Sequence, residues 1–370
     1  MEFKLGKILK KDIDDLRMDD IYQYHYDGII VITGIFHDAE LRALQDQADR
    51  TVEEAVERKG KNHLYRKVDN LGPEYFNYWN KDTSDNEVYC RSEKMWERNK
   101  IWRAVTANPR LLEAMGRLTG HSFMPMSDAF VCKLPYGKVP VEWHQDPPYS
   151  PPWVTDTTSE VPNIDADIYL DRSTIQNGCV YAIKGHHLSG SVRYENFDEE
   201  ILFNKSGAVP LEAEPGDVSF HPLSIPHGSR GNPTSDLRRI FYIHYVNRSV
   251  FDRDYKSIEF IDKIGYDGKF EDAGYEFVKK MVEDRRSLGW DMLESRNISL
   301  DINGFRYNGN DKTPKRYWGK LINKISEERM THLKNLDIIG SEKSSDNEVS
   351  KKIDETNNEL DKFMAGTTLN

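Results

Sequence analysis

The chain has 370 residues and a formal net charge of −11, with 62 acidic and 51 basic side chains. Because no long Lys/Arg block is present, duplex nucleic acid is not an expected partner. The first twenty residues are charged, and no run of about 18 apolar residues occurs, so we expect no membrane partner and a soluble, cytoplasmic protein.

Three cysteines are widely spaced and form no Cys-x-x-Cys pair: Cys90, Cys132 and Cys179. This pattern favours reduced thiols in the core over a disulfide framework or a structural zinc site. A chain of this length can hold one large domain with additions, and we expect a monomer or a homodimer.

The first 120 residues predict one strand, two helices and a loop-rich region. Residues 26–34 contain Ile-Ile-Val-Ile between glycines, which predicts a strand. Residues 39–58 carry apolar side chains at helical intervals, which predicts an amphipathic helix. Residues 60–100 have no clean period and are interpreted as loops. A second helix is expected at 109–120, where a proline occupies the favoured first turn and a glycine ends the helix.

Residues 121–250 change to short β-type runs separated by Pro and Gly. Several closely spaced strands with turns between them predict a sandwich or jelly roll rather than a parallel βαβ sheet. The runs expected to form strands are 130–134, 165–170, 179–183, 217–220 and 240–246.

Beyond residue 251 the helical pattern returns, at 274–288 and near 317–333, whereas 341–370 is polar with few apolar residues. We therefore predict a core of residues 1–250, a helical extension of residues 251–340 packed on that core, and a polar tail.

A His-x-Asp motif, His144 to Asp146, lies in a β-type run. Residues two apart in a strand share a face and lie about 6.5 Å apart, so both side chains can reach one metal ion. A third ligand is needed, and His227 is the best candidate downstream. Two histidines and one carboxylate leave metal positions open, as in non-haem Fe(II) oxygenases. The tripeptide alone is a weak signal, because an exposed histidine beside a carboxylate usually has no such role.

Arg238 stands at the start of an apolar run that follows His227. A buried arginine is costly unless its guanidinium meets an anion, and its planar fork suits a carboxylate. Either a carboxylate of the chain or a carboxylated cosubstrate would satisfy this requirement, and the sequence leaves both open.

Several motifs occur in an order and at a spacing that match one family. They are residues 26–28, 108–120, Trp143 to Asp146, 176–187, 215–229 and Arg238. Each motif is modest alone, but together they form a strong signal. Over about residues 26–245 the chain thus resembles the phytanoyl-CoA dioxygenase family of Fe(II)- and 2-oxoglutarate-dependent oxygenases.

This resemblance implies a mainly β fold, a double-stranded β-helix (cupin-like jelly roll) with N-terminal and C-terminal α-helical additions. It implies that His144, Asp146 and His227 hold Fe(II), and that Arg238, helped by Ser229, binds the far carboxylate of 2-oxoglutarate. Dioxygen is the other cosubstrate, ascorbate is an optional aid, and no catalytic residue is expected beyond the metal ligands. Decarboxylation to succinate would supply the oxidant that removes a hydrogen atom from the substrate.

The chain departs from the family pattern at two positions and keeps it at a third. Lys184 replaces a proline and His186 a serine, so we expect a differently shaped loop there. Asp146 is retained, whereas halogenating relatives carry a small residue at this position, so halogenation is disfavoured. Residues 251–370 have no counterpart in compact members of the family.

Asp165, Asp167 and Tyr169 alternate along one predicted strand and therefore share a face. Buried carboxylates need a cation or hydrogen-bond donors. We therefore expect an amine-bearing or amino-acid-derived substrate, with Lys133 available for a carboxylate at its other end. That these residues are solvated at a strand edge is an equally good interpretation.

The expected function is oxidation of a small-molecule metabolite, by hydroxylation or by radical cyclisation or desaturation, which use the same metal ligands. A 2-oxoglutarate-dependent protein hydroxylase and a catalytically silent jelly-roll binding module are the alternatives. The intact ligand set argues against silence, and no peptide-binding module is recognisable.

Overall fold

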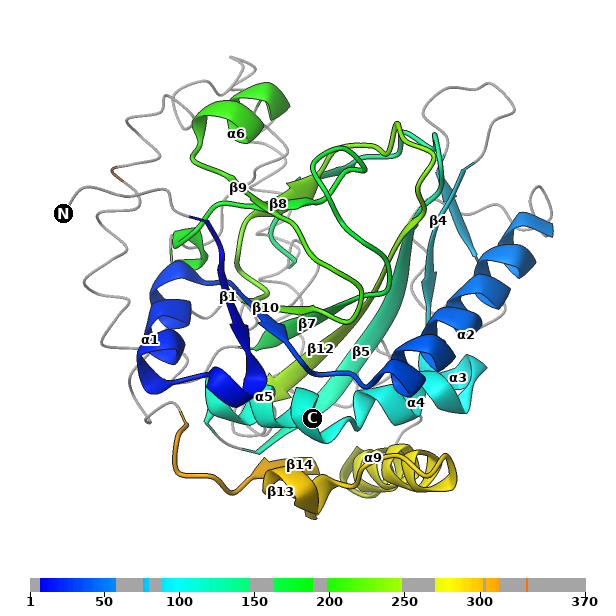
Figure 1. The fold of residues 1–370 in the computed structure, drawn as a ribbon, viewed down its shortest axis with the longest axis vertical. Coiled ribbons are helices and arrows are strands. Elements are labelled where there is room, and N and C mark those ends of the chain that lie inside the picture. Colours follow the sequence, from blue (N-terminus) through cyan, green and yellow to red (C-terminus); the bar gives the residue numbers. More distant parts are fainter. Residues whose placement is uncertain are drawn as a thin grey trace, which may run out of the picture.

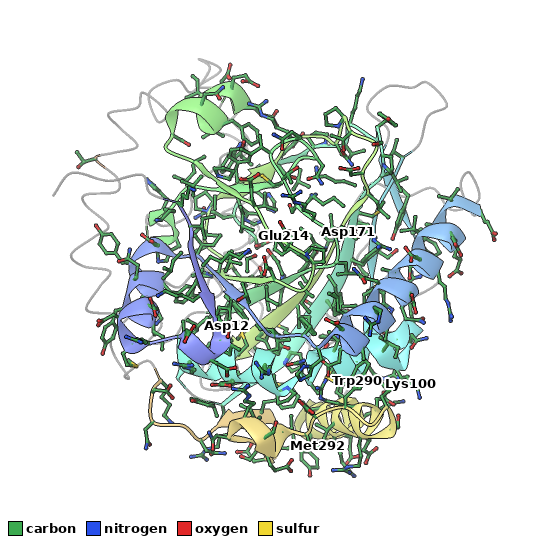
Figure 2. The ribbon with its side chains drawn as sticks, in the orientation of Figure 1. Asp12, Lys100, Asp171, Glu214, Trp290 and Met292 are labelled. Atoms are coloured by element: carbon green, nitrogen blue, oxygen red, sulfur yellow. The ribbon has the colours of Figure 1, made fainter. Side chains whose placement is uncertain are left out.

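Two β-sheets face each other, and helices cover the outer face of the larger sheet (Figure 1). The computed structural model describes residues 7–57, 76–79, 88–120, 122–146, 163–188, 198–247, 270–301, 304–312 and residue 331. Side chains fill the space between the sheets and beneath the helices (Figure 2).

The larger sheet has the order β1-β2-β10-β7-β12-β5-β14-β13, with β4 also paired to β5 and β3 paired to β4. Most neighbours are antiparallel, and β1 and β2 are parallel. The strands are β1 Leu9–Asp12, β2 Ile30–Thr33, β3 Asn77–Trp79, β4 Val88–Glu93, β5 Ser122–Lys133, β7 Ile164–Tyr169, β10 Val218–Pro222, β12 Arg238–Asn247, β13 Ile298–Asp301 and β14 Gly304–Tyr307.

The smaller sheet has the order β6-β11-β8-β9. Its strands are short: β6 Val141–His144, β8 Val180–Ala182, β9 Val209–Leu211 and β11 His227–Ser229. Apolar side chains from both sheets meet between them, among them Ile240 of the larger sheet and Leu211 of the smaller. This second core holds the smaller sheet over the larger one.

The helices pack mainly against the outer face of the larger sheet. The α-helices are α1 Met18–Asp27, α2 Asp38–Glu57, α3 Met95–Arg98, α4 Lys100–Thr106, α5 Pro109–Thr119, α6 Glu199–Lys205 and α9 Phe270–Ser287. Short 3-10 helices are η1 Ile13–Asp15, η3 His186–Leu188 and η5 Leu293–Arg296. Helix α5 begins where the Asn108 side chain accepts from the N–H groups of Arg110 and Leu111. Its apolar face then joins the core of the larger sheet.

Residues of the C-terminal part pack directly on this core. The Arg285 guanidinium on α9 is buried and pairs with Glu40 on α2. Strand β14 pairs with β5 and so extends the larger sheet. The guanidinium carbon of Arg285 lies 5.5 Å from the centre of the Trp290 ring, and Trp290, labelled in Figure 2, packs against the core. The three-part division of the chain remains a prediction, because residues 313–370, apart from residue 331, lie outside the described residues.

The jelly-roll prediction is confirmed, and so are the two N-terminal helices and the five strand runs, although the strand expected at 130–134 begins much earlier, at Ser122. The interpretation of residues 60–100 as loops is wrong where the structure describes them, because β3, β4 and α3 lie there. The charged lead-in differs from expectation because it contains β1 and α1. Helix α1 ends at Gly28, whose φ of +78° suits the turn, so β2 starts only at Ile30. Helix α4 and the β13–β14 pair were not predicted. Among the described helices, none is long and apolar enough to cross a bilayer.

Candidate metal and cosubstrate site

Three metal-ligand side chains converge on the smaller sheet. His144 ends β6, and His227 begins β11 as its direct cross-strand partner. Asp146 lies two residues after His144, and its backbone N–H donates to the Leu223 carbonyl at 3.0 Å. Its carboxylate oxygens lie 3.7 Å from His144 Nε2 and 3.9 Å from His227 Nε2. The three donor atoms lie within 4.8 Å of one another, which is close enough to share one ion.

Backbone carbonyls orient both imidazoles. His144 Nδ1 lies 2.7 Å from the Glu142 carbonyl, and His227 Nδ1 lies 3.0 Å from the Ile225 carbonyl. A carbonyl only accepts, so each Nδ1 carries the hydrogen and each Nε2 keeps its lone pair. Both lone pairs are therefore available beside Asp146, and this donor set fits a divalent first-row metal.

The electrostatics of the three side chains suit metal binding at neutral pH. Burial opposes ionisation of Asp146, but the two histidines hold its pKa well below the usual range. Burial, together with the neighbouring His144, lowers the pKa of His227 to about 4. For His144, burial lowers the pKa, but Asp146 reverses the direction and raises it. A bound cation would replace that proton, because both compete for the same lone pair.

A row of polar side chains crosses four strands of the larger sheet beneath the metal ligands. Ser127, His244, Asp165 and His221 are cross-strand neighbours on β5, β12, β7 and β10. Ser127 Oγ lies 3.0 Å from His244 Nδ1, and His244 Nε2 lies 2.7 Å from Asp165 Oδ1. Asp165 and His221 also approach Asp146 closely enough to form a second group of metal-ligand atoms. This row is thus the floor of the metal site.

The predicted substrate residues Asp165 and Asp167 are buried and already face histidines. Asp167 lies 3.2 Å from His221 Nε2 and accepts from the Ser219 hydroxyl at 3.0 Å. Burial lowers the pKa of His221, but Asp167 outweighs this effect and raises it to about 9. Burial lowers the pKa of His244.

That His221 and His244 face these aspartates was not predicted from the sequence. His244 lies within the strand expected at 240–246 and His221 directly follows the one expected at 217–220, but the sequence does not show which strands pair.

Lys133 and Tyr169 also lie on this face. The Lys133 ammonium donates to the Val139 and Arg230 carbonyls at 2.6 and 2.7 Å, so two of its three hydrogens are bound by the chain itself. The Tyr169 hydroxyl is buried and makes no hydrogen bond of ordinary geometry within the described residues. Lys133 is the direct cross-strand neighbour of Arg238 on β12, which sets both cations at one end of the sheet.

Arg238 carries a buried guanidinium that is only partly satisfied within the described residues. Only 1% of the residue is exposed, and its Nε and Nη1 atoms have no hydrogen-bond partner in the described part of the chain. The Ser229 hydroxyl on β11 is likewise buried and unpaired there. Burial lowers the Arg238 pKa. Unpaired buried donors of this kind fit a bound carboxylate, because leaving them empty is costly.

The next residue, Arg239, provides the contrast. It points to the other side of the sheet and pairs with Asp171 at 2.8 Å and with Asp49. Because these two aspartates satisfy the Arg239 guanidinium, Arg238 is the one of the two adjacent arginines that can bind an external carboxylate.

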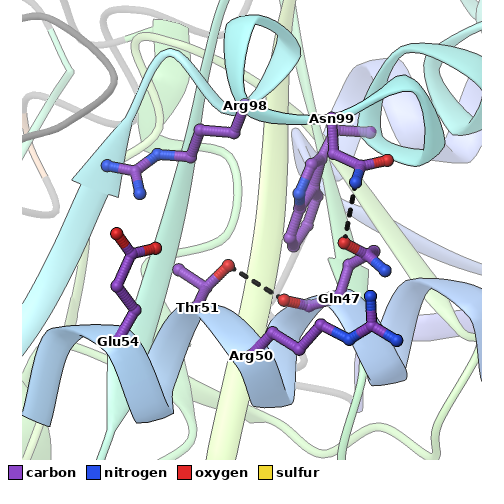
Figure 3. A pocket seen from close by; sticks show the side chains of 7 residues that line it. Gln47, Arg50, Thr51, Glu54, Arg98 and Asn99 are labelled. Atoms are coloured by element: carbon purple, nitrogen blue, oxygen red, sulfur yellow. Dashed lines mark hydrogen bonds between the residues drawn. The ribbon is translucent and has the colours of Figure 1, made fainter. Parts of the chain in front are cut away.

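A surface pocket of about 300 Å³ lies on the helix side of the molecule, between α2 and the α3–α4 segment (Figure 3). Two hydrogen bonds join its polar groups: Asn99 Nδ2 donates to Gln47 Oε1, and the Thr51 hydroxyl donates to the Gln47 backbone carbonyl, each at 2.9 Å. It shares no residue with the metal-ligand group, and we assign it no ligand. It is lined by Gln47, Arg50, Thr51, Glu54, Arg98, Asn99 and Trp102.

Comparison with known proteins agrees with the fold and the motifs. The phytanoyl-CoA dioxygenase (PhyH) family model matches residues 24–240, more than half of the chain. The chain therefore belongs to the phytanoyl-CoA dioxygenase family, whose members are Fe(II)- and 2-oxoglutarate-dependent oxygenases. The predicted family is thus confirmed.

Individual relatives are distant. Peroxisomal phytanoyl-CoA dioxygenase of Bos taurus is 26% identical over 240 residues, which cover 60% of this chain and 66% of the relative. Dioxygenase lolE1 of Epichloe uncinata is 25% identical over 170 residues, covering 45% of this chain and 63% of the relative. The chain thus spans less than two thirds of the length of these curated relatives.

Among solved structures, EctD from S. alaskensis with 2-oxoglutarate and 5-hydroxyectoine is similar in fold. Its TM-score is 0.50 at 19% identity, and the match covers 63% of this chain and 77% of that one.

Proposed function

We propose that the chain is a non-haem Fe(II)- and 2-oxoglutarate-dependent dioxygenase that oxidises a small molecule and releases succinate and CO2. One observation carries this proposal: two imidazole Nε2 atoms and a carboxylate converge on one point of the smaller sheet, and the larger sheet carries a buried arginine whose Nε and Nη1 atoms have no hydrogen-bond partner among the described residues. Membership of the family supports the same assignment.

In this proposal His144, Asp146 and His227 hold Fe(II) through Nε2, a carboxylate oxygen and Nε2. The backbone carbonyls behind both histidines keep the rings turned toward the ion. Arg238 pairs its fork with the far carboxylate of 2-oxoglutarate, and the Ser229 hydroxyl donates to the same group. When bound, iron, 2-oxoglutarate and dioxygen supply the oxidising chemistry, and the protein orients the reactants and limits water access.

The charge on the inner face supports a cationic substrate. Asp146 and Asp167 place two carboxylates beside Asp165, whose pKa is raised well above its usual range by burial and by Asp146, and 2-oxoglutarate would add two more carboxylates. Fe(II), Arg238 and the histidine partners balance part of this charge. We therefore propose an amine-bearing or amino-acid-derived substrate, attracted by the field of Asp165 and Asp167. Tyr169 and Lys133 would then complete the wall of the site near Arg238.

The decisive experiment incubates anaerobically purified protein with Fe(II) and 2-oxoglutarate, adds a metabolite extract and oxygen, and follows succinate. We expect extract-dependent succinate formation that is lost in the His227→Ala variant. An equal signal from parent and variant would refute the assignment.

The mass of the product then separates the possible outcomes. A gain of one oxygen indicates hydroxylation, whereas a loss of two hydrogens indicates cyclisation or desaturation. Succinate formation that follows the protein fraction of the extract would favour a protein hydroxylase instead.

A further inference from the structure

The inner face of the larger sheet is buried over one half and accessible over the other. On β7 and β10, the side chains of Asp165, Asp167 and His221 are 3%, 12% and 4% exposed. On β12 and β4, the side chains of His244 and Arg91 are 18% and 40% exposed. A substrate that reaches the metal therefore meets the β4–β5–β12 half first, and the two predicted aspartates lie beneath the accessible surface.

Four residues form this accessible surface, which we call the shelf: Arg91, Ser127, Tyr242 and His244. The Tyr242 and His244 rings are stacked, with centroids 5.3 Å apart and planes 27° apart. The Arg91 guanidinium carbon lies 5.2 Å from the centre of the Tyr242 ring. Side chains that hold each other in this way present a defined surface rather than a mobile one.

The shelf lies at the metal end of the sheet, away from Arg238. His244 shares its cross-strand row with Asp165, whose carboxylate approaches Asp146. Arg238 stands at the other end of β12. In the proposed function 2-oxoglutarate reaches from the metal to Arg238, so it occupies the half toward that arginine and leaves the shelf open.

Ser127 is the shelf residue whose hydroxyl is fixed from behind. It is half-buried on β5, and its Oγ lies 3.0 Å from His244 Nδ1, while His244 Nε2 lies 2.7 Å from the Asp165 carboxylate. A hydroxyl offers one hydrogen and two lone pairs, and the bond to His244 uses only one of these. Because Ser127 is half-buried, its remaining capacity is open to a ligand.

We propose that the primary substrate lies on the shelf and is held through a hydroxyl or amino group that hydrogen-bonds to Ser127, with His244 and Asp165 as positioning residues behind it. This inference rests on the proposed function and adds the residue that selects the substrate. Hydroxyl and amino groups suit this position because both donate to the oxygen of a serine. A purely hydrocarbon substrate would leave the Ser127 hydroxyl desolvated and unpaired.

Placement of Ser127 is tested by a Ser127→Cys variant labelled with a methanethiosulfonate nitroxide. The three native cysteines are buried, so background labelling should be low. Mn(II) bound by the metal ligands should broaden the nitroxide spectrum strongly, and the effect should vanish in a Ser127→Cys, His227→Ala double variant. Ser122→Cys, on the same strand but toward β14, is the matched control and should show much weaker broadening. Failure of the thiol introduced by Ser127→Cys to react, or broadening no greater than in the Ser122→Cys control, would overturn the placement.

Substrate selection is tested with the metabolite purified by its ability to drive succinate formation. In Ser127→Ala its KM should rise about five- to ten-fold, the scale of one lost hydrogen bond. The affinity for 2-oxoglutarate should not change, Ser127→Thr should restore the KM, and Ser122→Ala should leave it unaltered. Substrate derivatives identify the group that bonds to Ser127. When that hydroxyl is methylated or that amine acetylated, the parent and Ser127→Ala should have the same KM, whereas modification of any other group should leave their KM values different.

The outcomes separate the two proposals. If the parent enzyme forms succinate and Ser127→Ala keeps the parental KM, the shelf assignment fails and the proposed function stands. If the metal-loaded parent forms no succinate with any extract, the proposed function fails, and the shelf assignment fails with it.

Discussion

The two ends of the inner face of the larger sheet treat buried charge in opposite ways. At one end Arg238 is buried and its Nε and Nη1 atoms are unpaired within the described residues. At the other end Asp165 and Asp167 are 2% and 9% exposed, and each lies close to a histidine, although Asp165 Oδ1 makes no hydrogen bond of ordinary geometry within the described residues. An unpaired buried charge is costly, whereas a paired one is tolerated. The difference indicates that the arginine end can receive an external anion. At the aspartate end Asp167 is already paired within the chain, whereas burial and the nearby Asp146 raise the pKa of Asp165 well above its usual range.

The largest effect is expected at the metal ligands, which lie over the aspartate end. His227→Ala removes one of three protein donors, so iron affinity should fall by at least about 100-fold, since even the loss of an outer partner costs up to that much. Iron content after anaerobic loading and desalting measures the effect, with circular dichroism to confirm the fold. His37→Ala is the control, because His37 is exposed and pairs only with Asp291 within the described chain. Stoichiometric iron in the His227→Ala variant would contradict the assignment.

The arginine end should show the next largest effect. Arg238→Lys keeps the charge but loses the fork, so the affinity for 2-oxoglutarate should fall by about one to two orders of magnitude while iron still binds. Titration of the anaerobic Fe(II) enzyme with 2-oxoglutarate measures the change. Arg239→Lys is a matched control one residue away, since Arg239 is satisfied by Asp171 and Asp49. A loss in Arg239→Lys with none in Arg238→Lys would reverse the roles of the two arginines.

Sequence alone predicted the fold to the extent that local signals control it. Pro and Gly separate the β-type runs, and Asn108 and Gly120 cap the two ends of α5. The β13–β14 pair was missed although Asn303-Gly304 is a common hairpin signal, because the flanking strands are only four residues long. Their place beside β5 depends on tertiary packing, which a local pattern does not contain.

In the candidate site, too, residues that are close in sequence were predicted and long-range pairings were not. His144 and Asp146 are two residues apart, so their common face follows from strand geometry, and His227 follows from the family motif. The pairing of Asp165 with His244 joins strands about 80 residues apart in sequence. Such long-range register is set by the packing of whole sheets, so the histidine partners of both aspartates could not be derived from spacing.

The aspartate end allows a finer test of the comparison. Asp167→Asn removes one of the carboxylates that would attract a cationic substrate, so substrate KM should rise about three- to ten-fold while 2-oxoglutarate affinity stays nearly constant, because the field acts through a buried group and not a direct contact. Steady-state kinetics with an amine substrate and its neutral N-acetyl derivative measure this. The effect should be confined to the cationic form. An unaffected variant, or a substrate without a basic nitrogen, would show that these acids are structural.

Asp128 is a buried acid outside the candidate site, and its substitution should change only the stability of the protein, by the smallest amount of the effects predicted here. It is 7% exposed, accepts from the Trp96 N–H at 2.9 Å and forms no ion pair among the described residues. Burial raises its pKa to about 8, from an ordinary value of 3.8. Between these values the folded chain holds a proton that the unfolded chain has released, so the free energy of unfolding should fall as the pH rises from about 4 to about 8.

Asp128→Asn keeps the acceptor for Trp96 and stays neutral at every pH. The variant should therefore match the parent near pH 4 and melt a few degrees higher near pH 8.5, where the parent carries a buried carboxylate without an ion pair. Thermal unfolding at both pH values measures the gap, and Asp19→Asn is the control because Asp19 is exposed. A gap that does not widen with pH would mean that Asp128 ionises without cost. Burial alone would then not show that a charged group needs a partner. The proposal that Arg238 binds the far carboxylate of 2-oxoglutarate would depend only on the 2-oxoglutarate titration of the Arg238→Lys variant.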